Sequence, residues 1–514
     1  MPFHLEIDHH AAVTPDKPAF VLDGQIRTYA DLASRSRSFA SYIATLPGTR
    51  DGQSVPGGVR KITALDLGNH PLFAELFVGA TTGKNACAVL DPTMPATQLE
   101  EILTRLRPDL IVTGTMNSNA AKIAARMGLA IELASSFDRL AQGDQPAAAG
   151  DADVDADGDD TFLVSFTSGT TALPKAYSRS RASWRASFSR GRSLFGLENG
   201  PTTCCPGALA HGLALYALAE ALHSGGTFHS IRQWQAEGVA DLLSREGIQR
   251  FVAVPTMISG LAKTAIAKPG GFPMIRNVLT AGSKLGSKQV GQMRAMFPNA
   301  RIMEYYGASE LGFISVSTVV PFDAETPLQT VGKPFPGVGL SIRNSGGQVL
   351  GPGEVGTIHV HSDLICDGYL WGDDGKAFRA DAGGATVGDI GELDGNGALR
   401  VIGREGGMVV TGGFNVYPSE IETALRNIAD VDEAVVLGVE DDHLGTRLVA
   451  VLSGSFEDGD GVLSAAGTFL PRYKLPRNLF RTQSWPVTTS GKIARGKVAE
   501  ALRKGQYAAV ETSS

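Results

Sequence analysis

The segment TFLVSFTSGTTALPKAY, residues Thr161–Tyr177, joins a short apolar run to a loop rich in hydroxyl groups. The apolar run Phe162–Val164 predicts a buried strand. Hydroxyls and backbone N–H groups just beyond a strand can donate to phosphate oxygens, glycine lets the backbone approach, and a lysine adds a point charge. The Walker pattern GxxxxGK[ST] is absent, and for this segment alone a flexible turn stays open as an alternative. The segment predicts a phosphate-binding loop made of Thr167, Ser168, Gly169, Thr170, Thr171 and Lys175.

The size and composition of the chain indicate a large globular protein. Its 514 residues exceed one ordinary domain, and 43% hydrophobic with 19% charged residues are typical of chains that bury large cores. The net charge of −7 argues against a broad nucleic-acid surface.

Cysteine usage and the N-terminal sequence favour a cytoplasmic protein. The cysteines lack metal-ligand spacing, which favours free thiols in a reducing compartment. The N-terminal segment has no basic stretch followed by an apolar core, so we expect no signal peptide. No apolar run reaches the length of a transmembrane helix, although contact with a membrane surface stays open.

The first part of the chain alternates between two kinds of hydrophobic pattern. Helical spacing and short apolar strands follow one another through residues 1–140 and again through 161–320, which predicts a mostly parallel sheet with covered faces. The expected helices are Tyr29–Leu46, Pro71–Thr82 and Ala96–Leu106, and the expected strands are Ile62–Leu67, Ala86–Leu90 and Leu110–Val112. Between these regions, Gln142–Asp160 is rich in Ala, Asp and Gly and predicts a solvated linker; its Asp run lacks EF-hand spacing.

The last part of the chain changes character. Residues 330–403 contain short strands with frequent Gly and Pro, which predicts a small β-barrel or β-layer. A helix over Ser419–Ile428, a strand over Glu433–Val439 and a basic C-terminal helix are expected within a compact tail. The Gly-rich break at Gly403–Gly407 predicts two domains, 1–403 and 404–514.

The string Tyr305-Tyr306-Gly307-Ala308-Ser309-Glu310 could carry chemistry. A carboxylate can hold Mg²⁺, and the adjacent hydroxyl can contact a phosphate. Taken alone, the string also fits a core tyrosine pair before a helix capped by Ser309.

Together these strings resemble the AMP-forming adenylating enzymes, the superfamily of acyl-CoA synthetases, peptide-synthetase adenylation domains and luciferases. The first loop matches the family pattern [ST]SG[ST]TGxPKG, except that Ala172 and Ala176 stand where glycine is preferred. The resemblance covers essentially the whole chain. It implies an α/β fold: a large N-terminal domain of two α/β sheet subdomains plus a small β-barrel-like part, then a small mobile α+β C-terminal domain, with ATP and the acid between the domains.

The resemblance assigns nucleotide-binding roles to matching positions. The first loop and Lys175 would bind phosphates, and Glu310 would be the Mg²⁺ ligand, with Ser309 in place of the usual threonine. Asp389, in a GD element, would accept hydrogen bonds from the ribose hydroxyls, and Arg404 would be the second ribose partner. The remaining adenine or phosphate contacts implied are Gly282, Ser283, Tyr305, Tyr306 and Gly307.

The tail carries further family motifs. PVTTSGKIAR resembles the catalytic-lysine motif, so Lys492 would bridge the carboxylate substrate and the α-phosphate in the transition state. Gly406 stands at the hinge, where the family often has Asp or Lys. The string GGFNVYPSEIE is most similar to acyl-CoA synthetases, in which Gly412 and Gly413 would line the thiol tunnel.

His211 would border the acyl pocket as a conformational gate, although a lone histidine is also compatible with a structural role. The other expected pocket residues are largely apolar: Leu213, Ala214, Val254, Ala281 and Tyr305. Peptide-synthetase domains place an Asp near the His211 position to pair with an α-ammonium group. The neighbours Ala210 and Gly212 offer no such partner, which favours an uncharged acyl or aryl acid.

The implied reaction is ATP-dependent activation of a carboxylic acid to an acyl-adenylate, followed by transfer to CoA, with Mg²⁺ as the metal. Three alternatives stay open. The chain could load the acid onto the phosphopantetheine thiol of an acyl carrier protein, or it could be a regulatory adenylate-binding protein that has lost turnover. A luciferase-like oxygenase is the third alternative, and no residue specifically favours it.

Overall fold

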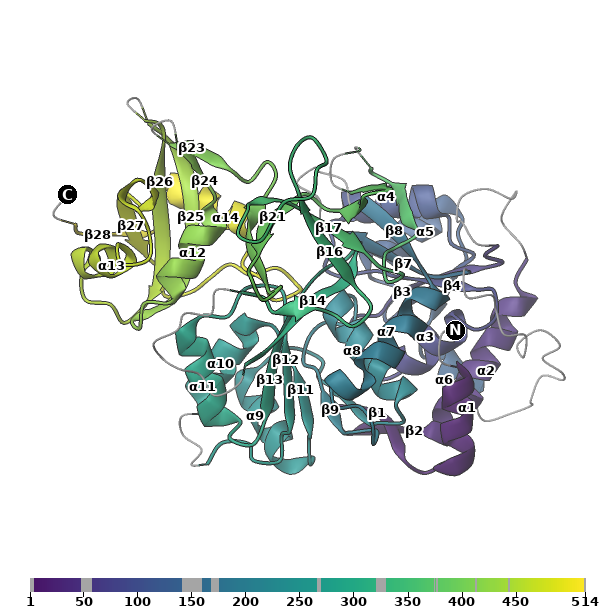
Figure 1. The fold of residues 1–514 in the computed structure, drawn as a ribbon. Helices are drawn as coiled ribbons and strands as arrows, with labels where there is room; N and C mark the ends of the chain where they lie inside the picture. The colour runs from purple at the N-terminus through teal and green to yellow at the C-terminus, as the bar shows by residue number, and fades with distance from the viewer. Residues whose placement is uncertain are drawn as a thin grey trace. The chain divides into compact units, whose positions relative to one another are not determined.

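The computed structural model describes residues 4–47, 58–140, 160–167, 175–265, 270–319, 330–373, 375, 378–411, 414–441 and 444–512. The chain forms two compact units that interleave along the sequence (Figure 1). The first unit comprises Met1–Ala253, Ala308–Phe313 and Ser362–Ala377, and the second comprises Val254–Gly307, Ile314–His361 and Phe378–Ser514. Because the units interleave, the expected domain boundary at residues 403 and 404 stays a prediction.

A seven-stranded sheet forms one part of the first unit. Its strand order is β18-β8-β7-β4-β3-β5-β6. The pairs within β7-β4-β3-β5-β6 are parallel, and β8 and β18 join antiparallel at one edge. The strands are β3 (Ile62–Asp66), β4 (Ala86–Val89), β5 (Leu110–Thr113), β6 (Ile131–Leu133), β7 (Thr161–Thr167), β8 (Lys175–Ser180) and β18 (Gly368–Trp371).

Helices cover this sheet with apolar faces that match their sequence period. In α4 (Ala96–Leu106), the buried residues Leu99, Ile102, Leu103 and Leu106 recur at helical spacing and join the core of the sheet. The helix α2 begins with a capping box, in which Thr28 and Asp31 satisfy each other's backbone N–H groups. The helices of the first unit are α1 (His4–Val13), α2 (Tyr29–Thr45), α3 (Phe73–Ala80), α4, α5 (Asn119–Met127), α6 (Ser136–Leu140), α7 (Arg181–Leu194), α8 (Gly212–His223) and α9 (Ala236–Arg245).

A second set of strands completes the first unit in the order β11-β9-β10-β1-β2. These strands are parallel except for the terminal pair of β1 and β2. The strands are β1 (Pro18–Leu22), β2 (Gln25–Thr28), β9 (Thr203–Cys204), β10 (Phe228–Ser230) and β11 (Arg250–Val252).

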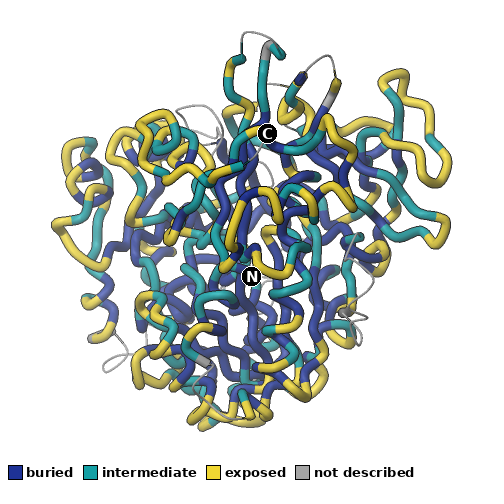
Figure 2. Tube along the Cα trace, turned by 90° about the vertical axis from the view of Figure 1, so that its left-hand side faces the viewer, coloured by how far each residue is buried: buried dark blue, intermediate teal, exposed yellow. Residues whose placement is uncertain are grey.

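Figure 2 shows buried residues, in dark blue, concentrated in the interior of the trace, with exposed residues mainly at its periphery.

The second unit contains an α/β segment and a β-rich layer. In the α/β segment β12 and β13 are parallel, and β14 pairs antiparallel with β15. The layer has the order β19-β20-β17-β21-β22 with β16 on β17, which confirms the β-rich segment expected within residues 330–403. These elements are α10 (Pro255–Ala265), β12 (Asn277–Thr280), α11 (Ser287–Met296), β13 (Arg301–Ala308), β14 (Gly312–Val319), β15 (Lys333–Pro334), β16 (Gly339–Arg343), β17 (Gly356–His361), β19 (Arg379–Asp381), β20 (Gly384–Thr386), β21 (Asp389–Leu393) and β22 (Leu399–Arg404).

The C-terminal segment is a small α+β structure inside the second unit (Figure 1). Its four-stranded sheet β25-β26-β27-β28 packs with α12 and α13 around buried residues such as Ile421, Val436 and Leu452. The expected helix, strand and basic C-terminal helix are confirmed as α12, β25 and α14. The elements are β23 (Val409–Thr411), β24 (Phe414–Val416), α12 (Pro418–Arg426), β25 (Val431–Asp441), β26 (Gly445–Gly454), α13 (Gly459–Ala466), the 3₁₀ turn Arg472–Lys474, β27 (Asn478–Arg481), α14 (Arg495–Arg503) and β28 (Ala508–Val510).

Asp160 corrects one expectation about the predicted linker. Residues 142–159 of that linker lie outside the described residues, but Asp160 is buried and faces the Lys84 ammonium at 3.7 Å. Its carbonyl accepts from the backbone N–H of Arg181. Asp160 therefore belongs to the folded structure, one residue before β7, which begins at Thr161 rather than at the predicted Phe162.

The thiols agree with the expectation that the cysteines are free. The cysteines are all buried and free: Cys87, Cys204, Cys205 and Cys366. Within the described ranges, no helix is both long enough and apolar enough to cross a membrane.

Candidate active site

In the first unit, a β-hairpin closes the predicted phosphate loop. Thr167 at the end of β7 pairs across from Lys175 at the start of β8, so the chain leaves and re-enters the sheet at adjacent positions. Ser168, Gly169, Thr170, Thr171 and the substituted Ala172 lie between them, outside the described residues. Ala176 lies inside β8 and is fully buried in the sheet core, which explains why a small apolar residue fits where the family prefers glycine.

Tyr369 contacts both Glu310, the predicted Mg²⁺ ligand, and Lys175, a predicted phosphate-binding residue. Its hydroxyl donates to Glu310 Oε1 at 2.5 Å, and the Lys175 ammonium lies 5.6 Å from the centre of its ring. Both charged residues are nearly buried, with exposed fractions of 9% for Glu310 and 7% for Lys175. The sequence did not single out Tyr369, because only the pairing of β18 with β8 brings it to this place.

Arg179 on β8 fixes the segment that carries Glu310. Its guanidinium donates to the carbonyls of Ser309, at 2.5 Å, and Leu364. The chain turns after β13 and enters β14 at Gly312, so Ser309 does not cap a helix and that structural alternative is wrong. The same strand, β8, thus presents Lys175 and holds the backbone next to Glu310.

His211 lies immediately before α8 and has an acidic neighbour. Its Nε2 is 3.4 Å from Oδ2 of Asp91, which follows β4. The prediction concerned only the sequence neighbours of His211, which offer no acidic partner; the structure adds Asp91, which is distant in sequence. Leu213, in the first turn of α8, is half-buried, and Ala214 beside it is buried.

In the second unit, two predicted adenine segments lie side by side. Ala281, Gly282 and Ser283 follow β12, and Tyr305–Gly307 close β13. The two strands are parallel, with Thr280 opposite Glu304, so both segments leave the same carboxyl edge. In α/β sheets, ligands bind at this edge. Val254 and Ala281 are buried, whereas Ser283 and Gly307 are exposed.

Tyr306, Asp389 and Arg404 form a hydrogen-bonded cluster in the same unit. Arg404 Nε donates to Asp389 Oδ1 at 2.7 Å, and the Tyr306 hydroxyl donates to Oδ2 of the same carboxylate. Asp389 and Arg404 face each other across the β21–β22 pair. Burial, reinforced by the Asp389 charge, raises the pKa of Tyr306 well above its usual value, so this phenol stays a neutral donor. The predicted ribose pair is therefore brought together, with Tyr306 as a third member.

Lys492 lies in a tight loop, next to the bridge that closes the base of the loop. Val487 and Ile493 bridge its base, and the Thr488 N–H donates to the Lys492 carbonyl at 2.7 Å. The Thr256 hydroxyl, in the first turn of α10, donates to the Gly491 carbonyl at 2.5 Å. This bond anchors the loop beside the start of α10.

The absence of a side chain at Gly282 makes room for Lys492. A Cβ at Gly282 would lie 2.9 Å from Lys492 Cε, and the backbone of Gly282 has a φ of +100°. Although Lys492 as a whole residue is exposed, poor hydration of its ammonium, together with the Arg404 charge, lowers the pKa of Lys492. The Lys492 ammonium thus lies near a second positive charge, that of Arg404, and an anionic ligand would reduce their mutual repulsion.

Two predicted features of the tail remain predictions. Gly406 has a φ of +76°, and no atom lies within 4 Å of the position that its Cβ would take, so the turn after Arg404 suits glycine. This conformation is compatible with a hinge. Gly412 and Gly413, expected in the thiol tunnel, lie outside the described residues.

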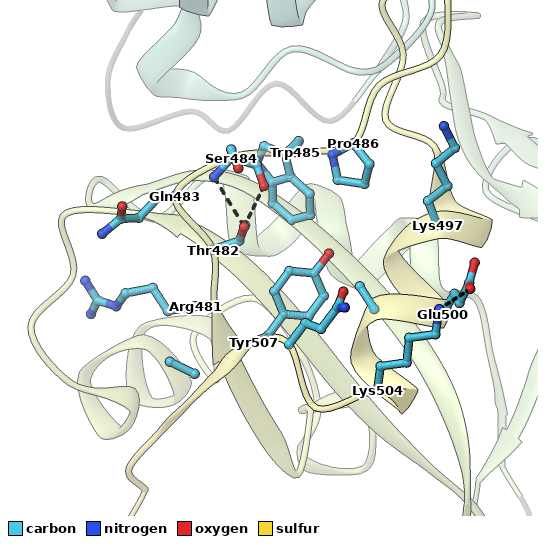
Figure 3. Close-up of a pocket in the computed structure, with 13 residues that line it drawn as sticks. Arg481, Thr482, Gln483, Ser484, Trp485, Pro486, Lys497, Glu500, Lys504 and Tyr507 are labelled. Carbon is cyan, nitrogen blue, oxygen red and sulfur yellow. Dashed lines mark hydrogen bonds and ion pairs between the residues drawn. The ribbon is translucent and has the colours of Figure 1, made fainter.

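The C-terminal segment also contains an open hollow of about 840 Å³ that none of the predicted site residues lines. Lys497 on α14 and Lys504, just after the end of α14, lie on one side of the hollow, and the rings of Trp485 and Tyr507 lie near its middle (Figure 3). Lys504 pairs with Glu500 at 2.6 Å. Lys492 is not among the lining residues, although Pro486, which is one of them, leads into the Lys492 loop.

Comparisons with known proteins identify the family of this chain. The pattern of the AMP-binding enzyme family matches residues 7–370, and that of the AMP-binding enzyme C-terminal domain matches residues 420–492. An uncharacterized acyl-CoA ligase, YhfT of Bacillus subtilis, is 30% identical over 499 residues, covering 97% of this chain and 98% of the relative. A putative long chain fatty acid-CoA ligase, VraA of Staphylococcus haemolyticus, is 31% identical over 353 residues, covering 68% of this chain and 72% of the relative.

Solved structures share the fold. ATP-bound MatB from Rhodopseudomonas palustris has a TM-score of 0.80 at 22% identity, covering 97% of this chain and 99% of that one. The o-succinylbenzoate-CoA synthetase MenE from Bacillus subtilis, in complex with its acyl-adenylate, has a TM-score of 0.79 at 23% identity, covering 96% and 97%. The chain belongs to the AMP-binding enzyme family, the AMP-forming adenylating superfamily, and is similar to its acyl-CoA synthetases.

Proposed function

We propose that this chain activates a carboxylic acid with ATP and transfers the acyl group to CoA, releasing AMP and pyrophosphate. The observation that carries the proposal is the cluster in the second unit. One compact unit contains the Lys492 loop, the Gly282 turn and the Asp389–Arg404 pair. The Gly282 turn lies at the carboxyl edge of parallel strands, where α/β sheets bind ligands. Relatives named as acyl-CoA ligases support CoA as the acceptor.

In the proposed first half-reaction, an acid oxygen attacks the α-phosphorus and the bond to pyrophosphate breaks. Lys492 stabilises the negative charge that develops on the phosphoryl and carboxylate oxygens. The Asp389 carboxylate accepts from the ribose hydroxyls while Arg404 holds it in place. Residues Thr167–Thr171 and Lys175 bind the phosphates.

Glu310 suits a cation that arrives with the nucleotide. The described residues contain no group of three or more His, Cys, Asp or Glu side chains that could hold a metal by themselves. Mg²⁺ typically takes one or two protein carboxylates plus substrate phosphates, and the nearly buried Glu310, oriented by Tyr369, offers one. When bound, Mg²⁺ would neutralise charge on the phosphate oxygens.

In the proposed second half-reaction, the thiolate of CoA attacks the acyl carbonyl, and the bond from the acyl carbon to the AMP oxygen breaks. AMP leaves readily because the adenylate is a mixed anhydride. Rotation about Gly406 would bring Gly412 and Gly413 to the thiol, as in the related synthetases. Buried, free cysteines and the use of CoA fit a cytoplasmic enzyme.

The acid is the open part of the proposal. Buried Val254 and Ala281 favour an uncharged acyl or aryl acid. The proximity of Asp91 to His211 removes the argument that no acidic residue is available for an amino group. A test panel therefore includes amino acids and dicarboxylic acids beside aliphatic and aromatic acids.

The proposal is tested by mass spectrometry of enzyme, Mg-ATP and the acid panel with two acceptors, CoA and a phosphopantetheinylated carrier protein. Acyl-CoA with matching AMP is expected. Acylation of the carrier protein alone would instead establish a carrier-loading enzyme. No product from any acid, with ATP still bound, would favour an adenylate-binding protein without turnover.

Gly282→Ala is expected to slow acyl-adenylate formation by about 10- to 100-fold, because the new methyl group would crowd Lys492 Cε and the backbone would be strained at positive φ. Gly291→Ala on α11 is the matched control, since no atom lies within 4 Å of its Cβ position. Pyrophosphate release measures both variants. Equal rates for Gly282→Ala and the control would show that Lys492 does not need this space.

Tyr369→Phe is expected to raise the Mg²⁺ concentration needed for half-maximal adenylation by about 10-fold, because Glu310 loses a short hydrogen bond that orients its carboxylate. Titration calorimetry of Mn²⁺ with ATP and enzyme is a second readout that needs no turnover. Tyr42→Phe is the control, since Tyr42 also donates to a glutamate, Glu132, at 3.2 Å. An unchanged metal requirement in Tyr369→Phe would exclude the orienting role.

A further inference from the structure

We propose that Asp91 is a positioning residue that holds the His211 imidazole where the acid substrate meets it. This inference deepens the proposed function and rests on it. Asp91 Oδ2 lies 3.4 Å from His211 Nε2, and both residues belong to the first unit. A carboxylate at this distance favours the ring orientation that places an Nε2–H group toward it.

The Asp91 carboxylate is itself held in place. Its Oδ1 accepts from both the backbone N–H of Thr93, at 2.9 Å, and the Thr93 hydroxyl, at 2.7 Å. The Asp91 carbonyl accepts from the Met94 N–H at 3.0 Å. One oxygen is therefore engaged by its own turn, and the other is the oxygen nearest His211. The side chain is only 12% exposed, which protects the contact from screening by solvent.

The backbone before His211 is fixed by a different residue. Asn69, in the turn after β3, accepts from the Leu209 N–H at 2.7 Å and donates to the Gly207 carbonyl at 3.0 Å. The His211 side chain itself makes no cap hydrogen bond to α8. The turns after the adjacent parallel strands β3 and β4 thus position the loop backbone and the imidazole separately.

This double support distinguishes a positioned side chain from an incidental surface contact. A histidine held only by packing could change rotamer at little cost, whereas the fixed Asp91 oxygen favours one orientation electrostatically. Substrate positioning by remote groups affects the rate strongly, since misplacement by about 1 Å can cost about 100-fold. We infer that Asp91 acts on the acid through His211 and has little effect on ATP.

The test compares Asp91→Asn with Glu6→Gln. Glu6 Oε1 lies 3.7 Å from His223 Nε2 at the opposite end of the same helix, α8, so it provides a matched carboxylate–histidine pair outside the proposed site. We expect Asp91→Asn to lower kcat/KM for the acid by about 10- to 100-fold and to leave KM for ATP unchanged. Glu6→Gln should change neither.

The second readout is the nitrogen NMR spectrum of enzyme with isotope-labelled histidine, which does not depend on turnover. The signal of His211 is assigned by its loss in His211→Gln. Asp91→Asn should shift this signal, and Glu6→Gln should shift that of His223 instead. If Asp91→Asn does not fold, Asp91→Glu, which keeps the charge on a longer arm, gives the same two readouts.

An unmoved His211 signal, or equal losses for acid and ATP, would overturn the proposal and leave Asp91 as a structural residue. Failure of the wild-type enzyme to activate any acid would overturn the proposed function, and with it the role toward the acid. The NMR shift would still decide whether Asp91 orients His211. The two failures are therefore distinguishable.

Discussion

Replacing Lys492 with alanine is expected to slow acyl-adenylate formation by about 100- to 1,000-fold, the loss typical of removing one group that stabilises transition-state charge. Thioester formation from a supplied acyl-adenylate should be largely spared, because that step makes and breaks bonds at the acyl carbon and none at the α-phosphorus. Pyrophosphate release measures the first half-reaction, and acyl-CoA formation from synthetic adenylate measures the second.

Lys497→Ala is the matched control for this prediction. Lys497 is exposed on α14, close in sequence to Lys492, and lines the hollow of the C-terminal segment. Its removal should leave both half-reactions intact. Equal losses in the two half-reactions of Lys492→Ala would contradict the assigned role. The lowered pKa of Lys492 predicts a pH dependence. Because adenylation needs the protonated amine, its rate should fall as the pH rises, and this fall should begin at a lower pH than an ordinary lysine would cause.

Asp389→Asn is expected to raise KM for ATP by about 10- to 100-fold, the range for hydrogen bonds that involve a charged group. The amide keeps the shape of the side chain but accepts more weakly from ribose hydroxyls and loses its ion pair with Arg404. Steady-state kinetics at saturating acid measure the change, and nucleotide binding measured by calorimetry should weaken in parallel.

Asp394→Asn is the control on the same hairpin. Asp394 lies in the turn between β21 and β22, where its Oδ1 accepts from the backbone N–H groups of Asn396 and Ala398, contacts that an asparagine oxygen can keep. Its KM for ATP should match that of the wild type. A KM for Asp389→Asn no higher than that of this control would remove Asp389 from the nucleotide site.

Local sequence patterns predicted the helices and hairpins whose formation depends on residues close together in sequence. The helix Ala96–Leu106 has the expected bounds because its apolar residues recur at helical spacing and Pro95 precedes it. The GD…GR string brought Asp389 and Arg404 together because the two residues face each other on one hairpin. Such short-range pairings follow from hairpin geometry alone.

The missed residues depend on contacts between distant segments. Tyr369 meets Glu310 only because β18 joins the edge of the sheet at β8, and Asp91 meets His211 only because the turn after β4 lies beside the start of α8. A single sequence carries no signal for these pairings beyond the presence of suitable side chains. The roles of Ser168–Thr171, Gly412 and Gly413 stay predictions, since these residues are outside the described ranges.

The measurement that tests the central claim most directly follows the oxygen atoms of the acid. An acid that the panel identifies is labelled with oxygen-18 in both carboxylate positions, and AMP is analysed after complete turnover with CoA. Attack of the carboxylate on the α-phosphorus predicts one oxygen-18 atom in AMP and one in the thioester. AMP without label, or label in phosphate released with ADP, would contradict activation through an acyl-adenylate.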